Sequence, residues 1–266
     1  MLSNIHENIW TDGCFDLFHY GHANHLRQAK SMATNLIVGL HSDMDIAENK
    51  KNSVTCLSER MFVMNSIKYV NKVVINTPYV TDLNILNQNN CHFCIHGNDK
   101  PLCVNGQDPY RFVKENGRYK SCARTRFIST TEIIERVLFP SFERNLTRTN
   151  VSSYSYLVGL LDKFREGHYL PCSGDNVVYI GGKFDILHPF LLHYLKKLKS
   201  PDNYLIVGVY SDQDIRKNLN FYPTLNSLER CLALSACRFV DWVVLDAPFK
   251  MKKDFIRHYN VFLHLI

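Results

Sequence analysis

The stretch Thr11-Asp12-Gly13-Cys14-Phe15-Asp16-Leu17-Phe18-His19-Tyr20-Gly21-His22 decides the fold of this chain. An apolar run reaches Trp10, a glycine turn follows, and two histidines stand three residues apart at an expected helix start. Residues three apart share one face of a helix, so His19 and His22 should point into the same space. The positive helix end favours a phosphate there, and Gly21 leaves room for a ligand. The stretch therefore predicts a functional site, against the alternative of histidines that are satisfied core or surface residues.

The composition is that of a globular protein with a full core. The 266 residues are 45% hydrophobic and 21% charged, and no apolar run approaches the roughly 20 residues of a membrane helix. Residues 1–10 lack the hydrophobic region of a secretory signal. Nine scattered cysteines fit a reducing compartment better than a disulfide framework. The net charge of +6 is dispersed and lacks the interleaved aromatic residues that suggest nucleic-acid binding, and a positive balance of this size suits a small anionic ligand equally well.

Apolar segments of strand length alternate with helical patterns in the first hundred residues. The expected strands are 5–11, 35–41, 72–76 and 91–96, and the expected helices are 22–33, 58–69 and 83–89, with a short helix opening at Ser42-Asp43. This alternation predicts an α/β fold with a parallel sheet covered on both faces. Ligands bind such sheets at the carboxyl ends of the strands, where the strand order reverses. The Gly13 turn and the Gly97-Asn98-Asp99 loop both follow strands and should meet there.

The same pattern returns later in the chain. Matching residues lie 169 or 170 positions apart: Asp16 with Asp185, His19 with His188, Gly39-x-x-Ser42-Asp43-x-Asp45-Ile46 with Gly208-x-x-Ser211-Asp212-x-Asp214-Ile215, Glu59-Arg60 with Glu229-Arg230, and Val73-Val74 with Val243-Val244. A constant register over separate blocks predicts a tandem duplication. We expect a first domain at 1–140, a linker at 141–172 that contains a short helix near 156–165, and a second domain at 173–266.

The two copies differ at the helix start. Gly21 is replaced by Phe190 and His22 by Leu191, and the second copy stops at a point opposite His96. A bulky apolar side chain at a phosphate site should block binding. The second copy is therefore predicted to be degenerate and truncated, a structural pseudo-domain, with an altered ligand site as the alternative.

Six blocks carry a resemblance to a known family: Asp12-Gly13-Cys14-Phe15-Asp16, His19-Tyr20-Gly21-His22, Val38-Gly39-Leu40-His41-Ser42-Asp43, His96-Gly97-Asn98-Asp99, Asn116-Gly117-Arg118-Tyr119, and Arg124-Thr125-x-x-Ile128-Ser129-Thr130-Thr131. The chain resembles the tandem cytidylyltransferases of the HxGH nucleotidyltransferase superfamily, and most closely those that act on ethanolamine phosphate. The resemblance is close over 9–138 and looser over 176–266. It implies two tandem Rossmann-like nucleotidyltransferase domains and a cytoplasmic location, and it leaves open peripheral attachment at the endoplasmic reticulum.

The reaction implied by the resemblance joins CTP and phosphoethanolamine to give CDP-ethanolamine and pyrophosphate, a step of phosphatidylethanolamine synthesis. Mg²⁺ is expected to arrive with CTP, without a dedicated metal site in the protein. Two alternatives stay open: a cytidylyltransferase for phosphocholine or glycerol 3-phosphate, and a nucleotide-binding regulatory protein without catalysis. The duplication is compatible with a monomer that acts as a pseudo-dimer and with a homodimer.

The resemblance also implies roles for individual residues. The catalytic residues would be His19, His22, Lys50 and Arg124. The nucleotide would be bound by Gly13, Cys14, Phe15, Asp16, His22, Thr125, Ile128, Ser129 and Thr130. The substrate end would contact Asp43, Tyr79, His96 and Asp99.

Several of these positions have a plainer interpretation. Lys50 has Lys51 as a neighbour and could be an ordinary loop lysine. Ser129-Thr130-Thr131-Glu132 is also a capping box, which needs no ligand to explain it. Phe127 stands where the family usually has glycine. Cys91-x-x-Cys94 is not expected to bind a metal, because residues three apart in a strand point to opposite faces.

Overall fold

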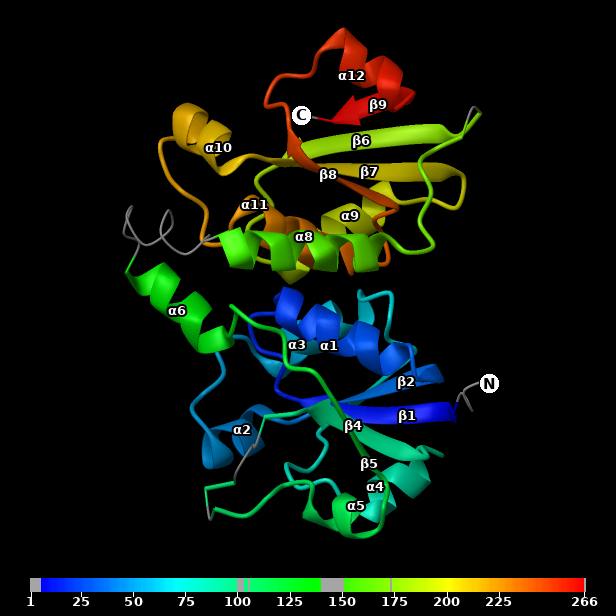
Figure 1. Ribbon diagram of the computed structural model, residues 1–266, viewed down its shortest axis with the longest axis vertical. Coiled ribbons are helices and arrows are strands. Elements are labelled where there is room, and N and C mark those ends of the chain that lie inside the picture. The colour runs from blue at the N-terminus through cyan, green and yellow to red at the C-terminus, as the bar shows by residue number, and fades with distance from the viewer. Residues whose placement is uncertain (1–5, 100–102, 105, 140–150, 173, 266) are drawn as a thin grey trace. The chain divides into compact units, whose positions relative to one another are not determined.

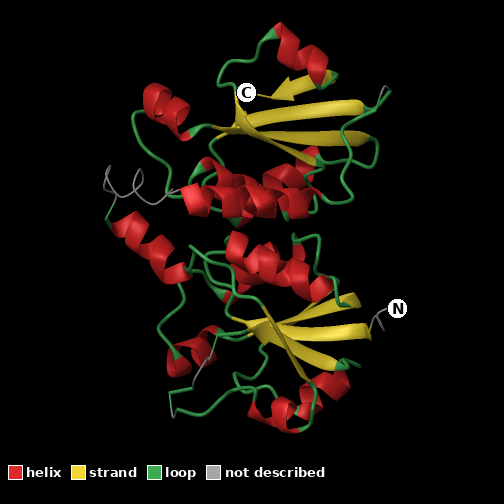
Figure 2. Cartoon of the chain, in the orientation of Figure 1, coloured by secondary structure: helices red, strands yellow, loops and turns green. Residues whose placement is uncertain are grey.

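The computed structural model describes residues 6–99, 103–104, 106–139, 151–172 and 174–265. The chain divides into two compact units, Met1–Arg126 and Phe127–Ile266. Each unit is built on a parallel sheet with helices on both faces (Figures 1 and 2). The predicted α/β fold with two parallel sheets is confirmed. Within the described residues, none of the helices combines the length and apolar character needed to cross a membrane.

The first unit alternates strands and helices along the chain. Its elements are β1 (His6–Gly13), α1 (Tyr20–Lys30), β2 (Ala33–Leu40), α2 (Asp43–Asn49), α3 (Leu57–Asn65), β3 (Lys72–Ile75), α4 (Leu83–Gln88), β4 (Phe93–Gly97), α5 (Arg111–Glu115) and β5 (Tyr119–Cys122). The strand order is β3-β2-β1-β4-β5, with α1 and α3 on one face and α4 and α5 on the other (Figure 1). The order reverses between β1 and β4, so the turn at Gly13 and the loop after Gly97 leave the sheet side by side.

The second unit repeats this plan. Its elements are α6 (Thr130–Leu138), α8 (Val151–Arg165), β6 (Asn176–Gly182), α9 (Pro189–Leu198), β7 (Asn203–Tyr210), α10 (Asp212–Leu219), α11 (Ser227–Ser235), β8 (Trp242–Ala247), α12 (Lys253–His258) and β9 (Val261–Leu265). The strand order β8-β7-β6-β9 matches β3-β2-β1-β4, and no counterpart of β5 occurs among the described residues. Helices α8, α9 and α11 lie on one face and α12 on the other (Figure 1).

The two sheets share a packing detail that requires glycine. A Cβ atom at Gly39 in β2 would come within 2.4 Å of the Trp10 ring, and one at Gly208 in β7 within 2.0 Å of the Tyr179 hydroxyl. Each aromatic ring lies across the neighbouring strand where only glycine leaves space. The duplication is therefore visible in side-chain packing as well as in strand order.

The unit boundary differs from the predicted domain boundary at 140. Helix α6 groups with the second unit, and within that unit Arg136 forms an ion pair with Glu229 of α11 at 2.7 Å. Helix α8 begins at Val151, earlier than the predicted 156, and packs against α11. Part of the expected linker is therefore an integral layer of the second unit, and residues 141–150 lie outside the described residues.

The two cysteines of Cys91-x-x-Cys94 do not point to opposite faces, contrary to expectation. Strand β4 begins only at Phe93, so Cys91 precedes it, and both thiols lie in one buried cluster with Trp10 and Tyr110. Both cysteines are free, and burial raises the pKa of Cys91 to about 11. They are therefore packed as small apolar side chains with little thiolate character.

Candidate nucleotide and substrate site

Two stacked histidine rings mark the start of α1. His19 is the N-cap residue, and its Nδ1 accepts a hydrogen bond from the Gly21 N–H at 3.1 Å. The rings of His19 and His22 stack with centroids 3.8 Å apart and an interplanar angle of 20°. The two side chains therefore occupy one space at the positive end of the helix, as their spacing predicted.

His22 is enclosed by aromatic rings. Its ring centroid lies 5.4 Å from that of Phe15 and 5.7 Å from that of Phe18. Its Nδ1 is buried and has no hydrogen-bond partner in the part of the chain that the structure describes. Burial lowers the pKa of His22 to about 4, although Asp16 opposes the shift. In the free protein at neutral pH, His22 is therefore a neutral ring that can donate through one nitrogen only.

His25 is a third histidine on this helix, and the sequence analysis did not assign it a role. Its Nε2 lies 2.7 Å from Thr11 Oγ1 and its Nδ1 lies 3.0 Å from Cys122 Sγ, so it connects α1 with β1 and β5. Burial lowers its pKa to about 3, with His96 and His22 adding to the shift. The sequence does distinguish His25, because the corresponding residue of the second copy is Tyr194.

Acid should destabilise the first unit through these histidines. Their pKa values fall from 6.5 to about 4 for His22 and about 3 for His25 on folding. Below pH 6.5 the unfolded chain therefore binds more protons, and the free energy of unfolding should drop as the pH falls from 6.5 toward 4. The His25→Gln variant should show a shallower drop. Urea unfolding at pH 7, 6 and 5 measures the free energy of unfolding at each pH. The transition is monitored through the fluorescence of Trp10 in a Trp242→Phe background.

The matched control for this prediction is His92→Gln, because His92 is exposed. This variant should keep the pH dependence of the wild-type chain. If His25→Gln and His92→Gln showed the same slope of unfolding free energy against pH, the buried imidazoles would not be responsible for the acid sensitivity.

The loop between β1 and α1 is held by Asp16. Phe15 and Leu17 adopt left-handed φ values of +50° and +43°, and a Cβ atom at Gly13 would lie 3.2 Å from the Phe15 ring. The Asp16 carboxylate accepts hydrogen bonds from the N–H groups of Val54 at 2.7 Å and of Thr55 at 2.9 Å. Asp16 thus fixes a strained turn to the loop that follows Lys50.

The second copy uses the same device. Asp185 accepts hydrogen bonds from the N–H groups of Thr224 at 2.8 Å and of Leu225 at 2.9 Å, and Phe184 has a φ of +42°. Since both copies keep this contact, the structure gives Asp16 a role in the scaffold, whether or not it also meets a nucleotide.

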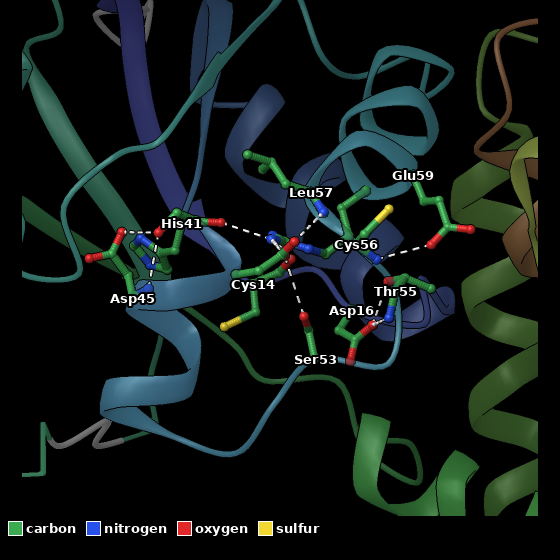
Figure 3. Close-up of polar contacts among 12 residues, drawn as sticks. Cys14, Asp16, His41, Asp45, Ser53, Thr55, Cys56, Leu57 and Glu59 are labelled. Atoms are coloured by element: carbon green, nitrogen blue, oxygen red, sulfur yellow. Dashed lines mark hydrogen bonds and ion pairs between the residues drawn. The ribbon is translucent and has the colours of Figure 1, made fainter.

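A buried arginine connects three segments near this loop. The Arg60 guanidinium donates to the carbonyl oxygens of Cys14 at 3.0 Å and His41 at 2.9 Å and to the Asp43 carboxylate at 2.6 Å. Figure 3 shows Cys14, His41 and Leu57 converging on this network. Asp43 also accepts from the Leu57 N–H at 3.0 Å. Asp43, predicted to bind substrate, is therefore engaged by the protein's own scaffold.

Lys50 lies at the end of α2 with its ammonium group 5.7 Å from the centre of the Tyr79 ring. Burial alone would lower the pKa of Lys50, but the neighbouring Cys14 and Tyr79 raise it above its usual value. Tyr79 is buried, and its ring centroid lies 5.1 Å from that of His41. Lys50 is thus a fully charged side chain brought close to the β1 turn, which suits an anionic ligand.

Asp99 connects two other predicted residues. Its carboxylate lies 3.2 Å from an Arg124 guanidinium nitrogen and 3.7 Å from Nδ1 of His96. The Arg124 N–H also donates to the Asn98 side chain at 3.0 Å. The loop after β4 and the segment at Arg124 are therefore held together at the carboxyl end of the sheet.

Asp12, at the end of β1, is a residue whose role the sequence analysis missed. It is buried, and its carboxylate accepts hydrogen bonds from the Tyr110 hydroxyl at 3.0 Å and from the Thr81 hydroxyl. No cationic side chain of the described residues forms an ion pair with it. Asp12 opposes the burial that lowers the pKa of His96. The sequence does distinguish Asp12 from its counterpart, because Gly181 occupies the corresponding position of the second copy.

The segment at Arg124-Thr125 docks on the start of α1. Asn24 donates to Thr125 Oγ1 at 3.0 Å, and the Tyr20 hydroxyl donates to the Arg126 carbonyl at 3.0 Å. The structure therefore joins Arg124 and Thr125 to the histidine pair within the first unit. The other predicted nucleotide residues of this motif, Ile128, Ser129 and Thr130, belong to the second unit.

Within the second unit, Ser129 caps α6. Its Oγ accepts a hydrogen bond from the Glu132 N–H at 3.1 Å, Thr130 is the first helical residue, and Ile128 is buried. Phe127 has a φ of +66°, in the left-handed region that glycine adopts at little cost. This explains the preference for glycine that the family resemblance implies at the position of Phe127.

The equivalent helix start of the second copy keeps only the cap. His188 Nδ1 accepts from the Phe190 N–H at 3.3 Å, as His19 does from Gly21. The Phe190 side chain is 81% exposed, and its expected blocking role stays a prediction. The second copy also lacks a counterpart of His22, because Leu191 occupies that position.

Comparison with known proteins identifies the family. A family model described as cytidylyltransferase-like matches residues 10–136 and 179–265, one segment in each copy. The ethanolamine-phosphate cytidylyltransferase of Mus musculus is 35% identical over 95% of this chain and 73% of its own length. The ethanolamine-phosphate cytidylyltransferase of Dictyostelium discoideum is 34% identical over 96% of this chain and 78% of its own length. Choline-phosphate cytidylyltransferase A of Rattus norvegicus is 36% identical over only 49% of this chain and 36% of its own length. The chain belongs to the family of ethanolamine-phosphate cytidylyltransferases.

Proposed function

We propose that this chain transfers the cytidylyl group of CTP to phosphoethanolamine, releasing pyrophosphate and forming CDP-ethanolamine for phosphatidylethanolamine synthesis. The observation that carries the proposal is the extent of the match. Relatives named for ethanolamine phosphate match both copies over 95% and 96% of the chain, whereas the relative named for choline phosphate matches 49%. The tandem arrangement is therefore shared with the former group.

The chemistry needs charge stabilisation more than proton transfer. A phosphate oxygen of phosphoethanolamine, already anionic near neutral pH, attacks the α-phosphorus of CTP. The new P–O bond forms as the bond from the α-phosphorus to the bridging oxygen breaks, and that oxygen leaves with pyrophosphate. Negative charge grows on the α-phosphate and the leaving group, so the site must align the reactants and supply donors.

The first unit offers those donors in one region. The stacked rings of His19 and His22 lie at the positive end of α1, burial keeps His22 neutral by lowering its pKa, and Lys50 supplies a full positive charge. Arg124 is held beside them through Asp99. We propose that the histidines and Lys50 contact the triphosphate and that Arg124 neutralises charge on a phosphate of one substrate. The nucleotide contacts of Cys14, Phe15, Thr125, Ile128, Ser129 and Thr130 stay predictions.

The acidic groups near β4 favour a cationic head group. Asp12 is a buried carboxylate without an ion-pair partner in the described residues, and Asp99 lies near His96. The aromatic rings of Tyr110 and His96, 4.7 Å apart, border the same region. Such carboxylates and rings stabilise a positively charged group, and glycerol 3-phosphate has no such group. This supports an amino-alcohol phosphate as the second substrate.

Mg²⁺ is proposed to enter as part of the substrate, bound to the triphosphate of CTP. In the described residues, no group of three or more His, Cys, Asp or Glu side chains is arranged to hold a metal ion. Mg²⁺ commonly binds through substrate phosphates and a few side chains while it keeps several waters. The reacting complex would then be Mg·CTP.

We also propose a cytoplasmic location, where both water-soluble substrates would be available. Peripheral attachment at the endoplasmic reticulum stays an expectation from the family resemblance. A monomer and a homodimer are both compatible with the duplicated fold.

Substrate choice tests the proposal directly. The purified chain is incubated with CTP, Mg²⁺ and one of phosphoethanolamine, phosphocholine or glycerol 3-phosphate, and pyrophosphate release is followed. Turnover should be fastest with phosphoethanolamine, by at least about tenfold in kcat/KM, as expected when a pocket discriminates against added methyl groups. Absence of turnover with all three would contradict an enzymatic function, and faster turnover with phosphocholine would contradict the substrate.

A further inference from the structure

One side of helix α1 holds the chain segment that contains Arg124. Residues four positions apart share a side of a helix, as Tyr20, Asn24 and Gln28 do here. Each of them donates a hydrogen bond at 3.0 Å to the segment 123–126: the Tyr20 hydroxyl to the Arg126 carbonyl, the Asn24 amide to Thr125 Oγ1, and the Gln28 amide to the Ala123 carbonyl. Helix α1 therefore contacts this segment on both sides of Arg124.

The end of strand β5 is held by the same helix. Nδ1 of His25 lies 3.0 Å from Sγ of Cys122, and the Cys122 carbonyl accepts a hydrogen bond from the Asn98 N–H at 2.9 Å. The Asn98 side chain in turn accepts from the Arg124 N–H at 3.0 Å. The Arg124 backbone is thus held by its neighbours, while its side chain is 58% exposed and contacts Asp99. A fixed backbone with an accessible guanidinium group suits a residue that binds an anionic ligand.

The same segment reaches the first turn of α1. The Thr125 hydroxyl donates to the Gly21 carbonyl at 3.5 Å, and Gly21 lies between the two stacked histidines. Asn24, which holds Thr125, is buried, and its side-chain oxygen accepts a hydrogen bond from Nε of Arg27 at 3.1 Å. The Asn24 amide therefore uses both its donor and its acceptor. This fixes its orientation, and with it the position of the residue next to Arg124.

The second copy keeps the core side of this helix but not the side that contacts the segment. Leu26 and its counterpart Leu195 are both fully buried. The four residues that contact the segment all differ, because Tyr20, Asn24, His25 and Gln28 correspond to Pro189, His193, Tyr194 and Lys197. Among the described residues, the second unit also has no counterpart of β5, the strand that leads to Arg124. The polar side of α1 therefore occurs together with the segment that it holds and is not needed to form the helix.

We propose that Asn24 and Gln28 are positioning residues for CTP binding: they align Arg124 along α1 so that its guanidinium group meets a phosphate of CTP beside the histidine pair. The inference rests on the proposed function and narrows it, because it assigns Arg124 to CTP rather than to phosphoethanolamine. Neither Asn24 nor Gln28 is expected to touch the ligand, so the effect of each should depend on the presence of Arg124.

Calorimetric titration of the full chain with Mg·CTP tests this inference. Asn24→Ala should raise the Kd about tenfold, because a displacement of about 1 Å in a binding group can cost that much or more. Gln28→Ala should raise the Kd in the same way but by a smaller factor. Its hydrogen bond is exposed, so this variant should stay folded. The Kd for phosphoethanolamine should not change in either variant.

A double-mutant cycle separates positioning from a general loss of stability. If Asn24 acts through Arg124, the chain with both Asn24→Ala and Arg124→Ala should bind CTP about as weakly as Arg124→Ala alone, because no guanidinium group is left to align. Effects of the two substitutions that multiply would overturn the positioning role. An unchanged Kd for CTP in Arg124→Ala, or in a folded Asn24→Ala chain, would also overturn it.

The matched control is Asn35→Ala. The Asn35 amide also donates at 3.0 Å, to the Asn8 side chain, at the opposite end of β1 from Gly13. The control removes the same chemical group from the same unit, and it should leave the Kd for CTP unchanged at temperatures where Trp10 fluorescence shows both variants to be folded. An equal rise in Kd for Asn35→Ala would contradict the inference. A chain that shows the expected differences in CTP binding but releases no pyrophosphate would contradict the proposed reaction alone.

Discussion

Replacing His22 with alanine is expected to lower kcat by on the order of 10²–10³, the usual loss when one preorganised donor to a developing negative charge is removed. His22 stacks on His19 at 3.8 Å, so its ring is fixed before substrate arrives. Phe15 and Phe18 close the remaining sides, which limits rotation of the ring. Alanine removes the donor without changing the cap that His19 forms. Steady-state kinetics with CTP and phosphoethanolamine measure the effect.

The second copy supplies the control for this variant. Leu191 is the counterpart of His22, and Leu191→Ala should change stability modestly while leaving kcat within about twofold, since a partly exposed leucine offers no donor. Unfolding of the first unit, followed through Trp10, must show that His22→Ala is folded at the assay temperature. A folded His22→Ala chain with wild-type kcat would remove His22 from the catalytic residues. Loss of activity in a folded Leu191→Ala chain would contradict the pseudo-domain.

Much of the fold could be predicted because its strands are apolar and regularly spaced. The strands and helices up to β4 were expected at nearly their observed positions, and the duplication followed from the constant register. The short strand β5, Tyr-Lys-Ser-Cys, has no such signal, since it is a strand only through its pairing with β4. The grouping of α6 with the second unit was equally hidden, because its contact with α11 joins two residues 93 positions apart, Arg136 and Glu229.

The candidate site was predicted less completely, because motif residues serve the scaffold as well as the chemistry. Asp16 was expected to orient the nucleotide-binding turn and Asp43 to contact substrate, and both copies use the matching aspartates to accept internal hydrogen bonds. Residues that differ between the copies are more informative. Asp12 lies at the end of β1, and His25 of α1 contacts β1 and β5. The second copy has Gly181 and Tyr194 at these positions. The sequence contained that comparison, but the residues' burial and partners appear only in the structure.

Replacing Arg60 with methionine is expected to lower the free energy of unfolding of the first unit by about 2–5 kcal/mol. The carbonyl groups of Cys14 and His41 would lose a charged donor at 3.0 and 2.9 Å, and each unsatisfied buried group costs about 1–3 kcal/mol. Asp43 is 47% exposed and can be rehydrated, so its loss of a partner adds little. Methionine fills much of the volume, which limits any cavity contribution. Urea unfolding followed by Trp10 fluorescence measures the change.

Arg230→Met is the matched variant in the second unit, because Arg230 makes the same contacts there. It donates to the Tyr210 carbonyl at 2.8 Å and to Asp212 at 2.5 Å, and it also reaches the Lys183 carbonyl. Each unit contains one of the two tryptophans, so Arg60→Met should shift the Trp10 transition and Arg230→Met the Trp242 transition by similar amounts. Equal losses would mean that both copies inherited this arginine as part of the fold. A loss confined to Arg60 would instead mean that the corresponding contacts of Arg230 do not stabilise the second unit to the same extent.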